Sequence, residues 1–328
     1  MMSSKNPIVR ALIALCFCGA AASAQAQQFQ QWISDASGST KVGTQVKVER
    51  FTPATGRQIK AAGFDFVRFG VWINSMQAED YRKRVGDAFA AAQQSGLPVL
   101  LTVRSTVPLA RSATGQTVRD AQLQMAARQL ADMIRDLDSA YGRNLLAIEL
   151  WNEPDLPTYW PTGDVETTFP VYMRMLCTEL KRIHTPSPII GFGFAKVPLP
   201  GSKSDRLLRR VAESSAHCID AVSYHAYGMS ELQIENASTY IRDQYGLPAL
   251  ITEWGASSGG WAGASGQAEN IESFLSKRRS MKTPLVSIYE WQDTRNGKNT
   301  RERNLGLVDA AGEEKPALGA ALTVLRKR

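Results

Sequence analysis

Eight short apolar segments alternate with eight helix-like segments along almost the whole chain. The apolar segments span residues 42–51, 64–72, 97–103, 145–150, 188–195, 219–227, 248–253 and 284–291. Between and after them, apolar residues recur at helical spacing over 57–62, 80–95, 118–141, 172–184, 205–215, 231–245, 267–281 and 315–326. Strands that alternate with helices form parallel sheets whose two faces are covered. The alternation therefore predicts an α/β fold.

The number of units distinguishes between the two common parallel architectures. Eight β–α units in roughly 300 residues favour closure into a single (β/α)8 TIM barrel. An open doubly wound sheet is disfavoured, because no glycine-rich dinucleotide turn follows the first segment. The sequence shows no solenoid repeat and no low-complexity linker. We expect one barrel domain over residues 27–328.

Residues 1–26 have the composition of a secretory signal peptide. Lys5 and Arg10 give a charged start, residues 11–22 are apolar, and 24–26 (Ala-Gln-Ala) form a small-x-small cleavage pattern. We expect cleavage before Gln27 and a secreted or periplasmic protein. No later run is long and apolar enough to span a membrane, so we expect no membrane attachment after cleavage.

Two cysteines, Cys177 and Cys218, follow the predicted signal peptide. In an oxidising compartment they could pair. Because Cys177 falls in a predicted helix and Cys218 just before a predicted strand, we expect two separate buried thiols rather than a disulfide.

The formal net charge of +7 does not indicate a nucleic-acid partner. Basic residues cluster only at 277–279 and 326–328, as on solvated helix faces and tails. No nucleic-acid-binding motif accompanies the charge, so we expect no nucleic-acid binding. A weak attraction to an acidic polysaccharide stays open, and we expect a monomer.

Two of the predicted strands end in a glutamate. Segment 145–150 leads into Trp-Asn-Glu-Pro, which contains Glu153, and segment 248–253 ends in Glu253 within Thr-Glu-Trp-Gly. A single glutamate after a strand is usually a solvated loop residue. In a barrel, however, the carboxyl ends of all strands meet at one face. Two glutamates that face each other there are the pair that cleaves glycosidic bonds.

These two motifs, at the fourth and seventh strands, closely resemble those of the retaining (β/α)8-barrel glycoside hydrolases, a clan that includes cellulases, β-mannanases and β-xylosidases. The resemblance implies that Glu153 is the acid/base and Glu253 the nucleophile of a secreted hydrolase of β-linked polysaccharides or oligosaccharides. It implies no cofactor. We also expect no metal, because no His/Asp/Glu cluster in the sequence has ligand spacing.

The resemblance also implies two groups that hold the nucleophile. Tyr227 matches a family tyrosine that donates a hydrogen bond to that carboxylate, and Arg68 matches an arginine that keeps it ionised. Arg68 has an alternative interpretation, since an arginine in a barrel strand could simply pair with Glu49 or Asp65.

Three further residues match sugar-binding positions of the family. Asn152 matches the residue that contacts the sugar 2-hydroxyl, and Trp291 matches the aromatic floor under the central sugar. His225 matches a sugar-facing or acid-positioning residue, although it could also be a buried hydrogen-bonded spacer. Four more tryptophans are candidates for outer sugar subsites: Trp72, Trp160, Trp254 and Trp261.

Several alternatives stay open at this point. The third strand ends in Thr102-Val103-Arg104, where some clan members carry a histidine, which leaves the subfamily undecided. A catalytically silent carbohydrate-binding barrel, or a transglycosylase of an exopolysaccharide system, would use the same residues. Sugar identity, and exo or endo action, depend on loops such as 105–117 and 156–170.

Overall fold

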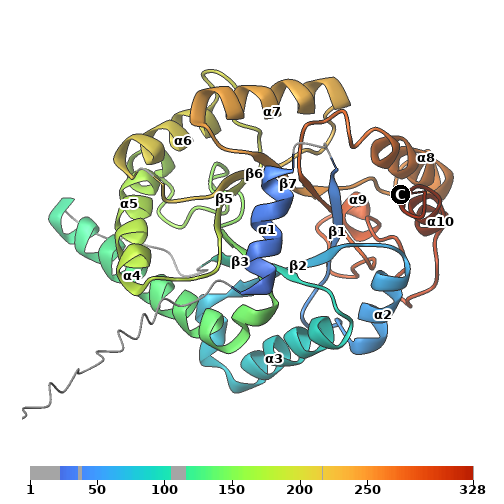
Figure 1. The fold of residues 1–328 in the computed structure, drawn as a ribbon, viewed down its shortest axis with the longest axis horizontal. Helices are drawn as coiled ribbons and strands as arrows, with labels where there is room; N and C mark the ends of the chain where they lie inside the picture. Colours follow the sequence, from blue (N-terminus) through green and yellow to red (C-terminus); the bar gives the residue numbers. More distant parts are fainter. Residues whose placement is uncertain (1–22, 36–38, 105–115, 216, 328) are drawn as a thin grey trace, which may run out of the picture.

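Eight parallel strands close into a barrel in sequential order, with β1 paired to β8 (Figure 1). The structure is a computed structural model that describes residues 23–35, 39–104, 116–215 and 217–327. Its strands are β1 (Lys41–Gln45), β2 (Phe66–Trp72), β3 (Val99–Arg104), β4 (Leu145–Leu150), β5 (Ile189–Phe194), β6 (Ala221–His225), β7 (Ala249–Trp254) and β8 (Leu285–Ile288). The prediction of a single (β/α)8 barrel is confirmed.

Helices surround the barrel and bury its outer face. They are α2 (Pro53–Ala61), α3 (Glu79–Gln94), α4 (Gln116–Tyr141), α5 (Val165–Ile183), α6 (Lys203–Ser214), α7 (Glu231–Tyr245), α8 (Gly263–Ser276) and α10 (Pro316–Leu325). Short helices η1 (Ile73–Gln77), η2 (Gly142–Asn144) and α9 (Thr300–Arg303) lie in the connections. Among the residues described here, no helix has both the length and the apolar composition needed to cross a bilayer.

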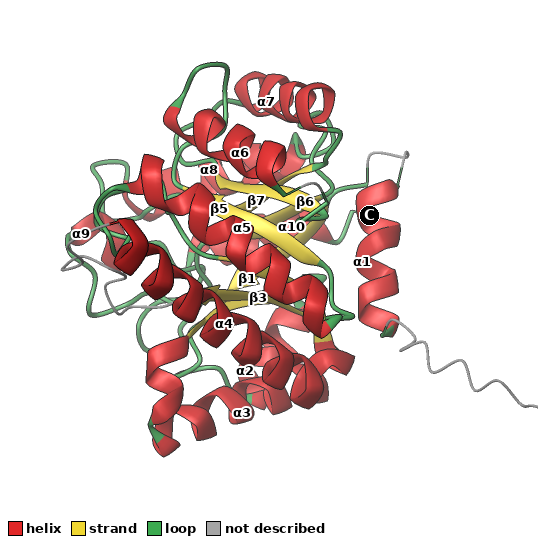
Figure 2. Ribbon diagram, turned by 90° about the vertical axis from the view of Figure 1, so that its left-hand side faces the viewer, coloured by secondary structure: helices red, strands yellow, loops and turns green. Residues whose placement is uncertain are grey.

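The first described helix, α1 (Ala24–Ser34), covers one end of the barrel, and α9 lies at the other end (Figure 2). Phe29 and Trp32 of α1 pack on a layer of apolar side chains inside the barrel: Phe66, Leu100, Leu146, Ala147, Ile190, Ala221, Leu250 and Leu285. A chain that starts at Gln27 would keep both of these aromatic residues. Residues 1–22 of the predicted signal peptide lie outside the described residues.

The predicted first strand was too long. The strand ladder of β1 ends at Gln45, whereas the prediction continued to residue 51. Apolar residues recur beyond the ladder because Val46, Val48 and Phe51 are buried in the core from the connecting segment rather than from the sheet. Burial without strand pairing produces the same alternation in the sequence.

The predicted start of helix α5 at residue 172 was also wrong. The helix begins at Val165 and contains Pro170 in its second turn. A proline cannot donate to the carbonyl four residues earlier. That carbonyl belongs to Glu166, and it accepts a hydrogen bond from Arg210 Nη1 at 2.7 Å. The side chain of Arg210 thus replaces the missing backbone donor.

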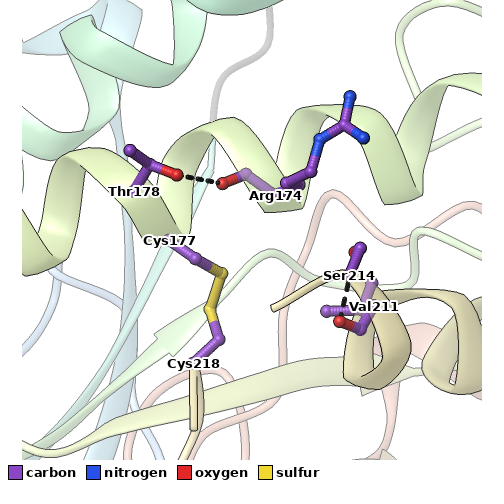
Figure 3. Close-up of a disulfide and its surroundings, with 6 residues drawn as sticks. All are labelled: Arg174, Cys177, Thr178, Val211, Ser214 and Cys218. Atoms are coloured by element: carbon purple, nitrogen blue, oxygen red, sulfur yellow. Dashed lines mark hydrogen bonds between the residues drawn. A yellow bond between two sulfur atoms is a disulfide. The ribbon is translucent and has the colours of Figure 1, made fainter. Parts of the chain in front are cut away.

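The two cysteines form a disulfide, contrary to the expectation of separate thiols (Figure 3). Cys177 lies in α5 and Cys218 just before β6, with their Cα atoms 5.5 Å apart. The sequence positions suggested distant elements, but α5 packs against α6, and Cys218 lies in the connection that leads from α6 into β6. The bond ties α5 to the start of the next strand but one.

This disulfide is expected to stabilise the fold by about 2–4 kcal/mol. It closes a loop of 41 residues, and closing a loop of that length removes much of the conformational entropy of the unfolded chain. The variant Cys177→Ala/Cys218→Ala should therefore unfold at a lower urea concentration. Reductant should lower the midpoint of the wild type and leave that of the variant unchanged. Equal midpoints without reductant would contradict the prediction.

Candidate active site

The carboxyl ends of the strands open into a cavity of about 1140 Å³. Five of the predicted site residues line it: Arg68, Asn152, Glu153, Tyr227 and Glu253. They come from β2, from the turn after β4, from the segment after β6 and from β7. The closed barrel therefore brings together residues that are up to 185 positions apart in the chain.

Glu153 and Glu253 face each other at this mouth. One carboxylate oxygen of each lies within 4.8 Å of the other. Glu153 (φ 54) and Trp151 (φ 74) have left-handed backbone conformations, which are uncommon for residues other than glycine and cluster at functional sites. The turn is held by a hydrogen bond from the Glu153 amide to the Gly193 carbonyl at 2.8 Å.

The Glu253 carboxylate is bound on both oxygens. Arg68 Nη1 donates to Oε1 at 2.7 Å, and the Tyr227 hydroxyl donates to Oε2 at 3.1 Å. His225 Nδ1 lies 3.5 Å from the same Oε2. Both oxygens of Glu253 thus accept hydrogen bonds, one of them from the buried guanidinium of Arg68.

Arg68 is buried and binds a glutamate that the sequence analysis did not single out. Its Nη2 and Nε donate to Glu149 Oε2 at 2.6 and 2.9 Å, and Thr102 Oγ1 donates to the same oxygen at 2.6 Å. Burial favours a raised pKa for Glu149, but the charge of Arg68 and the hydrogen bond from Thr102, acting together with smaller contributions, lower the pKa. Arg68 therefore pairs with two carboxylates at once, and neither Glu49 nor Asp65 is its partner.

Two sequence signals point to Glu149 in retrospect. It is a charged residue inside an otherwise apolar strand, and it precedes Glu153 by four positions. Such a residue in a covered strand requires a partner in the barrel interior. Arg68 also donates to Asn152 Oδ1 at 3.1 Å, so one guanidinium orients residues of both glutamate motifs.

His225 and Glu153 form a close pair. His225 Nδ1 is 2.9 Å from Glu153 Oε1, and the imidazole is buried below the cavity surface. Burial opposes a charged imidazole, but the carboxylates of Glu253 and Glu153 raise the pKa of His225. Burial also favours a protonated Glu153, but the hydrogen bond with His225 lowers its pKa. The two groups are therefore best described as sharing one proton.

Trp291 is not brought to this cavity. It is 3% exposed and packs edge-on against Phe64, with ring centroids 6.1 Å apart. Tyr289, two residues earlier, lines the cavity instead, and its ring centroid is 6.4 Å from that of Tyr227. The aromatic residue at the end of β8 is thus a tyrosine. Its position depends on where the strand leaves the sheet, which the sequence pattern did not resolve.

The four candidate outer tryptophans occupy different environments. Trp72 lines the cavity. Trp160 is buried, and Trp254 stacks on Phe274 at 3.6 Å, so both belong to the core. Trp261 is fully exposed and does not line the cavity. Residues 105–115, which include most of one predicted specificity loop, lie outside the described residues.

Glu290 is a buried carboxyl group beside the cavity, 3.4 Å from Lys47 Nζ. Burial raises the pKa of Glu290 to about 7. A carboxyl group with a folded pKa above its unfolded value stabilises the fold below the unfolded pKa, and this contribution is lost as the pH rises through the folded pKa. The window here runs from about pH 4.5 to about pH 7.

The free energy of unfolding of the wild type should therefore fall by about 3 kcal/mol between about pH 5 and pH 8 because of Glu290. The variant Glu290→Gln should not show this fall. Urea denaturation at several pH values measures this. The variant should approach or exceed the wild type in stability at pH 8 and show no advantage at pH 5. Parallel pH curves for the two proteins would contradict the assignment.

The fold also brings three potential metal ligands together. Glu153, His225 and Glu253 each offer a donor atom within 4.8 Å of the others, although they come from three different strand ends. The guanidinium of Arg68 already supplies positive charge at 2.7 Å from Glu253 and would repel a divalent cation. That the site needs no metal stays a prediction.

Comparisons with known proteins give a fold but no close relative. No protein-family model and no curated protein sequence matches the chain. A family 39 glycoside hydrolase from the gut symbiont Bacteroides cellulosilyticus WH2 matches with a TM-score of 0.67 and 18% identity, over 88% of this chain and 64% of that one. An exo-β-1,4-mannosidase from Opitutaceae bacterium strain TAV5 matches with a TM-score of 0.65 and 18% identity, over 89% and 60%.

A third solved structure matches over nearly its full length. It is an endo-β-1,4-xylanase of family 10 from Gloeophyllum trabeum, with a TM-score of 0.61 and 17% identity, over 87% of this chain and 96% of that one. The chain spans less than two thirds of the first two proteins, at 64% and 60% of their lengths. At these identities the likeness shows a shared fold. The chain has the (β/α)8 barrel fold found in these glycoside hydrolases.

Proposed function

We propose that this protein is a secreted retaining glycoside hydrolase that cleaves β-glycosidic bonds of a polysaccharide or oligosaccharide. The observation that carries the proposal is the approach of the Glu153 and Glu253 carboxylates to within 4.8 Å on the floor of one cavity. Retaining enzymes hold their two carboxyl groups about 5–5.5 Å apart, whereas inverting enzymes leave about 6.5–9.5 Å for a water molecule.

The environments of the two glutamates support different roles in a double displacement. Glu253, bound by Arg68 and Tyr227, attacks the anomeric carbon and forms a glycosyl–enzyme bond as the glycosidic bond breaks. Glu153 donates the proton shared with His225 to the leaving oxygen. Glu153 then takes a proton from water, the water oxygen attacks the anomeric carbon, and the Glu253 carboxylate is released.

Two further features fit a carbohydrate substrate. Asn152, fixed by Arg68, faces the cavity next to Glu153 and can bind a sugar hydroxyl. Tyr289 and Trp72 line the same cavity with aromatic surface on which a sugar ring can stack. The proposal includes secretion, with a mature chain that starts at Gln27. It also includes a monomeric enzyme that needs no metal or cofactor.

The stereochemistry of the product tests the mechanism. The purified protein is incubated with aryl β-glycosides of several sugars, and the anomer released first is observed by proton NMR before mutarotation. The proposal predicts the β-anomer as the first product. First release of the α-anomer would identify an inverting enzyme, and no release from any β-glycoside or β-linked polysaccharide would contradict the hydrolase assignment.

A pH profile tests the pair of His225 and Glu153. In the wild type the raised pKa of His225 keeps one proton on the pair above pH 6.5, so activity should persist to a pH above that value. In the variant His225→Gln only the Glu153 carboxyl group can hold this proton. The alkaline limb of kcat/KM should move to lower pH by about one unit or more.

His184→Asn is the control for this prediction. His184 ends α5 with a left-handed backbone, which asparagine tolerates, and it does not line the cavity. The pH profile of this control should match the wild type. An unchanged alkaline limb in His225→Gln would show that His225 does not hold the catalytic proton.

A further inference from the structure

The wall of the cavity is strongly basic. Outside the group around the two glutamates and Arg68, its described lining has two acidic side chains, Glu49 and Glu302, and six basic ones: Lys47, Arg50, Arg104, Arg295, Lys298 and Arg301. Lys47 is paired with Glu290. The other five form no ion pair with a described carboxylate, so the cavity carries a surplus of positive charge.

Arg104 lines the cavity and stacks on one of its aromatic side chains. It ends β3, and its guanidinium lies 3.8 Å from the ring centroid of Trp72 and 5.2 Å from that of Tyr159. Its Nε is buried and has no hydrogen-bond partner among the described residues. The segment that follows, 105–115, contains no Asp or Glu in its sequence. Among the described residues no carboxylate forms an ion pair with this guanidinium, although the charges of Glu153 and Glu253 attract it.

Lys298 approaches the same aromatic residue from another loop. Its Nζ donates to the Tyr159 hydroxyl at 3.0 Å and lies 5.3 Å from the ring centroid. Glu302, the acidic side chain nearest in sequence, accepts from the Lys298 backbone amide rather than from its ammonium group. Two cations and two aromatic rings thus converge on one wall of the cavity.

Burying the Arg104 guanidinium without an ion-pair partner costs free energy of desolvation. Burial lowers the pKa of Arg104, because the desolvation of its charge outweighs the attraction of the glutamates nearby. A neutral sugar would leave this cost in place. A planar anion would remove it, because arginine binds carboxylate and sulfate groups through paired, charge-assisted hydrogen bonds.

We propose that the glycan bound in this cavity is acidic, and that Arg104 and Lys298 bind a carboxylate or sulfate group on the sugar that stacks against Trp72 and Tyr159. This inference rests on the proposed function for the identity of the ligand as a carbohydrate. The inference adds to that function that the substrate is an acidic glycan. The alternative is that Arg104 acts only on the charge of Glu153, in which case it would affect acidic and neutral glycans equally.

The test compares glycans that differ only in charge. The probes are cello-oligosaccharides, the same chains carboxylated at C6, and the same chains sulfated at C6. Hyaluronan oligosaccharides and their carboxyl-reduced form provide a second backbone. Binding to the full chain carrying Glu253→Gln, which prevents turnover, is measured by isothermal titration calorimetry. Hydrolysis by the wild type is measured in parallel.

At least one charged probe should bind tenfold or more tightly than its neutral counterpart. Arg104→Gln should reduce this preference by about 10- to 100-fold, the effect of losing a charge-assisted hydrogen-bond pair. Raising NaCl from about 50 to about 500 mM should weaken binding of the charged probe only. The preference for the carboxylated or the sulfated chain identifies the anion.

Arg57→Gln is the matched control, since Arg57 is exposed on α2, does not line the cavity and carries the same charge. It should leave the preference unchanged. The inference is overturned if neutral probes bind as tightly as charged ones, if no charged probe binds, or if Arg104→Gln weakens both classes equally. Binding with the expected charge preference but no hydrolysis by the wild type would overturn the proposed function and leave the inference intact.

Discussion

Glu253→Gln should lower the rate of hydrolysis by about 10⁴-fold or more while leaving the fold intact. Glutamine has the same shape but cannot form the glycosyl–enzyme bond. Its amide oxygen can take the place of Oε1 and still accept from Arg68, while its amide NH2 takes the place of Oε2 and can donate to the Tyr227 hydroxyl oxygen. The loss should therefore appear in kcat rather than in the stability of the protein.

The measurement is kcat/KM on an aryl β-glycoside, together with the urea midpoint. Glu269→Gln is the control, because Glu269 is exposed on α8 and does not line the cavity. The control should keep wild-type activity. A Glu253→Gln variant as active as the wild type would remove the nucleophile assignment and with it the proposed mechanism.

Arg68→Met is expected to have the largest effect on stability, about 3–5 kcal/mol at neutral pH. The substitution leaves the buried carboxylate of Glu149 without its cation, and it also removes the cation that pairs with Glu253. Activity should fall at least 100-fold, because removing one preorganised stabilising donor typically costs about that much.

The pH dependence of Arg68→Met follows from the pKa of Glu149. In the wild type this pKa is lowered, so its contribution is present above the unfolded value near 4.5 and is lost as the pH falls. The deficit of the variant should therefore be largest at neutral pH and shrink toward acidic pH. Urea denaturation across pH 4 to 8 measures it.

A double variant separates stability from catalysis. Arg68→Met/Glu149→Gln removes the unpaired charge, so it should recover a large part of the lost stability without recovering activity. A single variant Arg68→Met as stable as the wild type at neutral pH would show that the buried pairs with Glu149 and Glu253 contribute nothing net. The same urea experiments decide this.

The barrel and its two glutamates could be predicted because both depend on local patterns. Apolar runs of strand length, and apolar residues at helical spacing, show which residues are buried. Each of these patterns is contained in a short stretch of sequence. The motifs around Glu153 and Glu253 stand directly after such runs. Once eight parallel strands are assumed to close, their carboxyl ends must share one face, and the two glutamates become neighbours without further information.

Other features depend on which residues meet across the barrel. Glu149 was a visible anomaly in an apolar strand, but its partner Arg68 lies 81 positions away and becomes evident only when β2 and β4 face the same interior. Cys177 and Cys218 pair because α5 packs beside the start of β6. Tyr289 rather than Trp291 reaches the cavity because β8 ends three residues earlier than the apolar pattern.

The sequence alone established the eight-unit alternation, the barrel that follows from it, and the carboxylate pair at its mouth, because burial and strand ends leave periodic marks in neighbouring residues. Folding decided the partners: which cation holds which carboxylate, which aromatic side chain faces the cavity, and that Arg104 Nε has no hydrogen-bond partner among the described residues. These depend on distances between residues far apart in the chain, and a linear pattern carries no record of them.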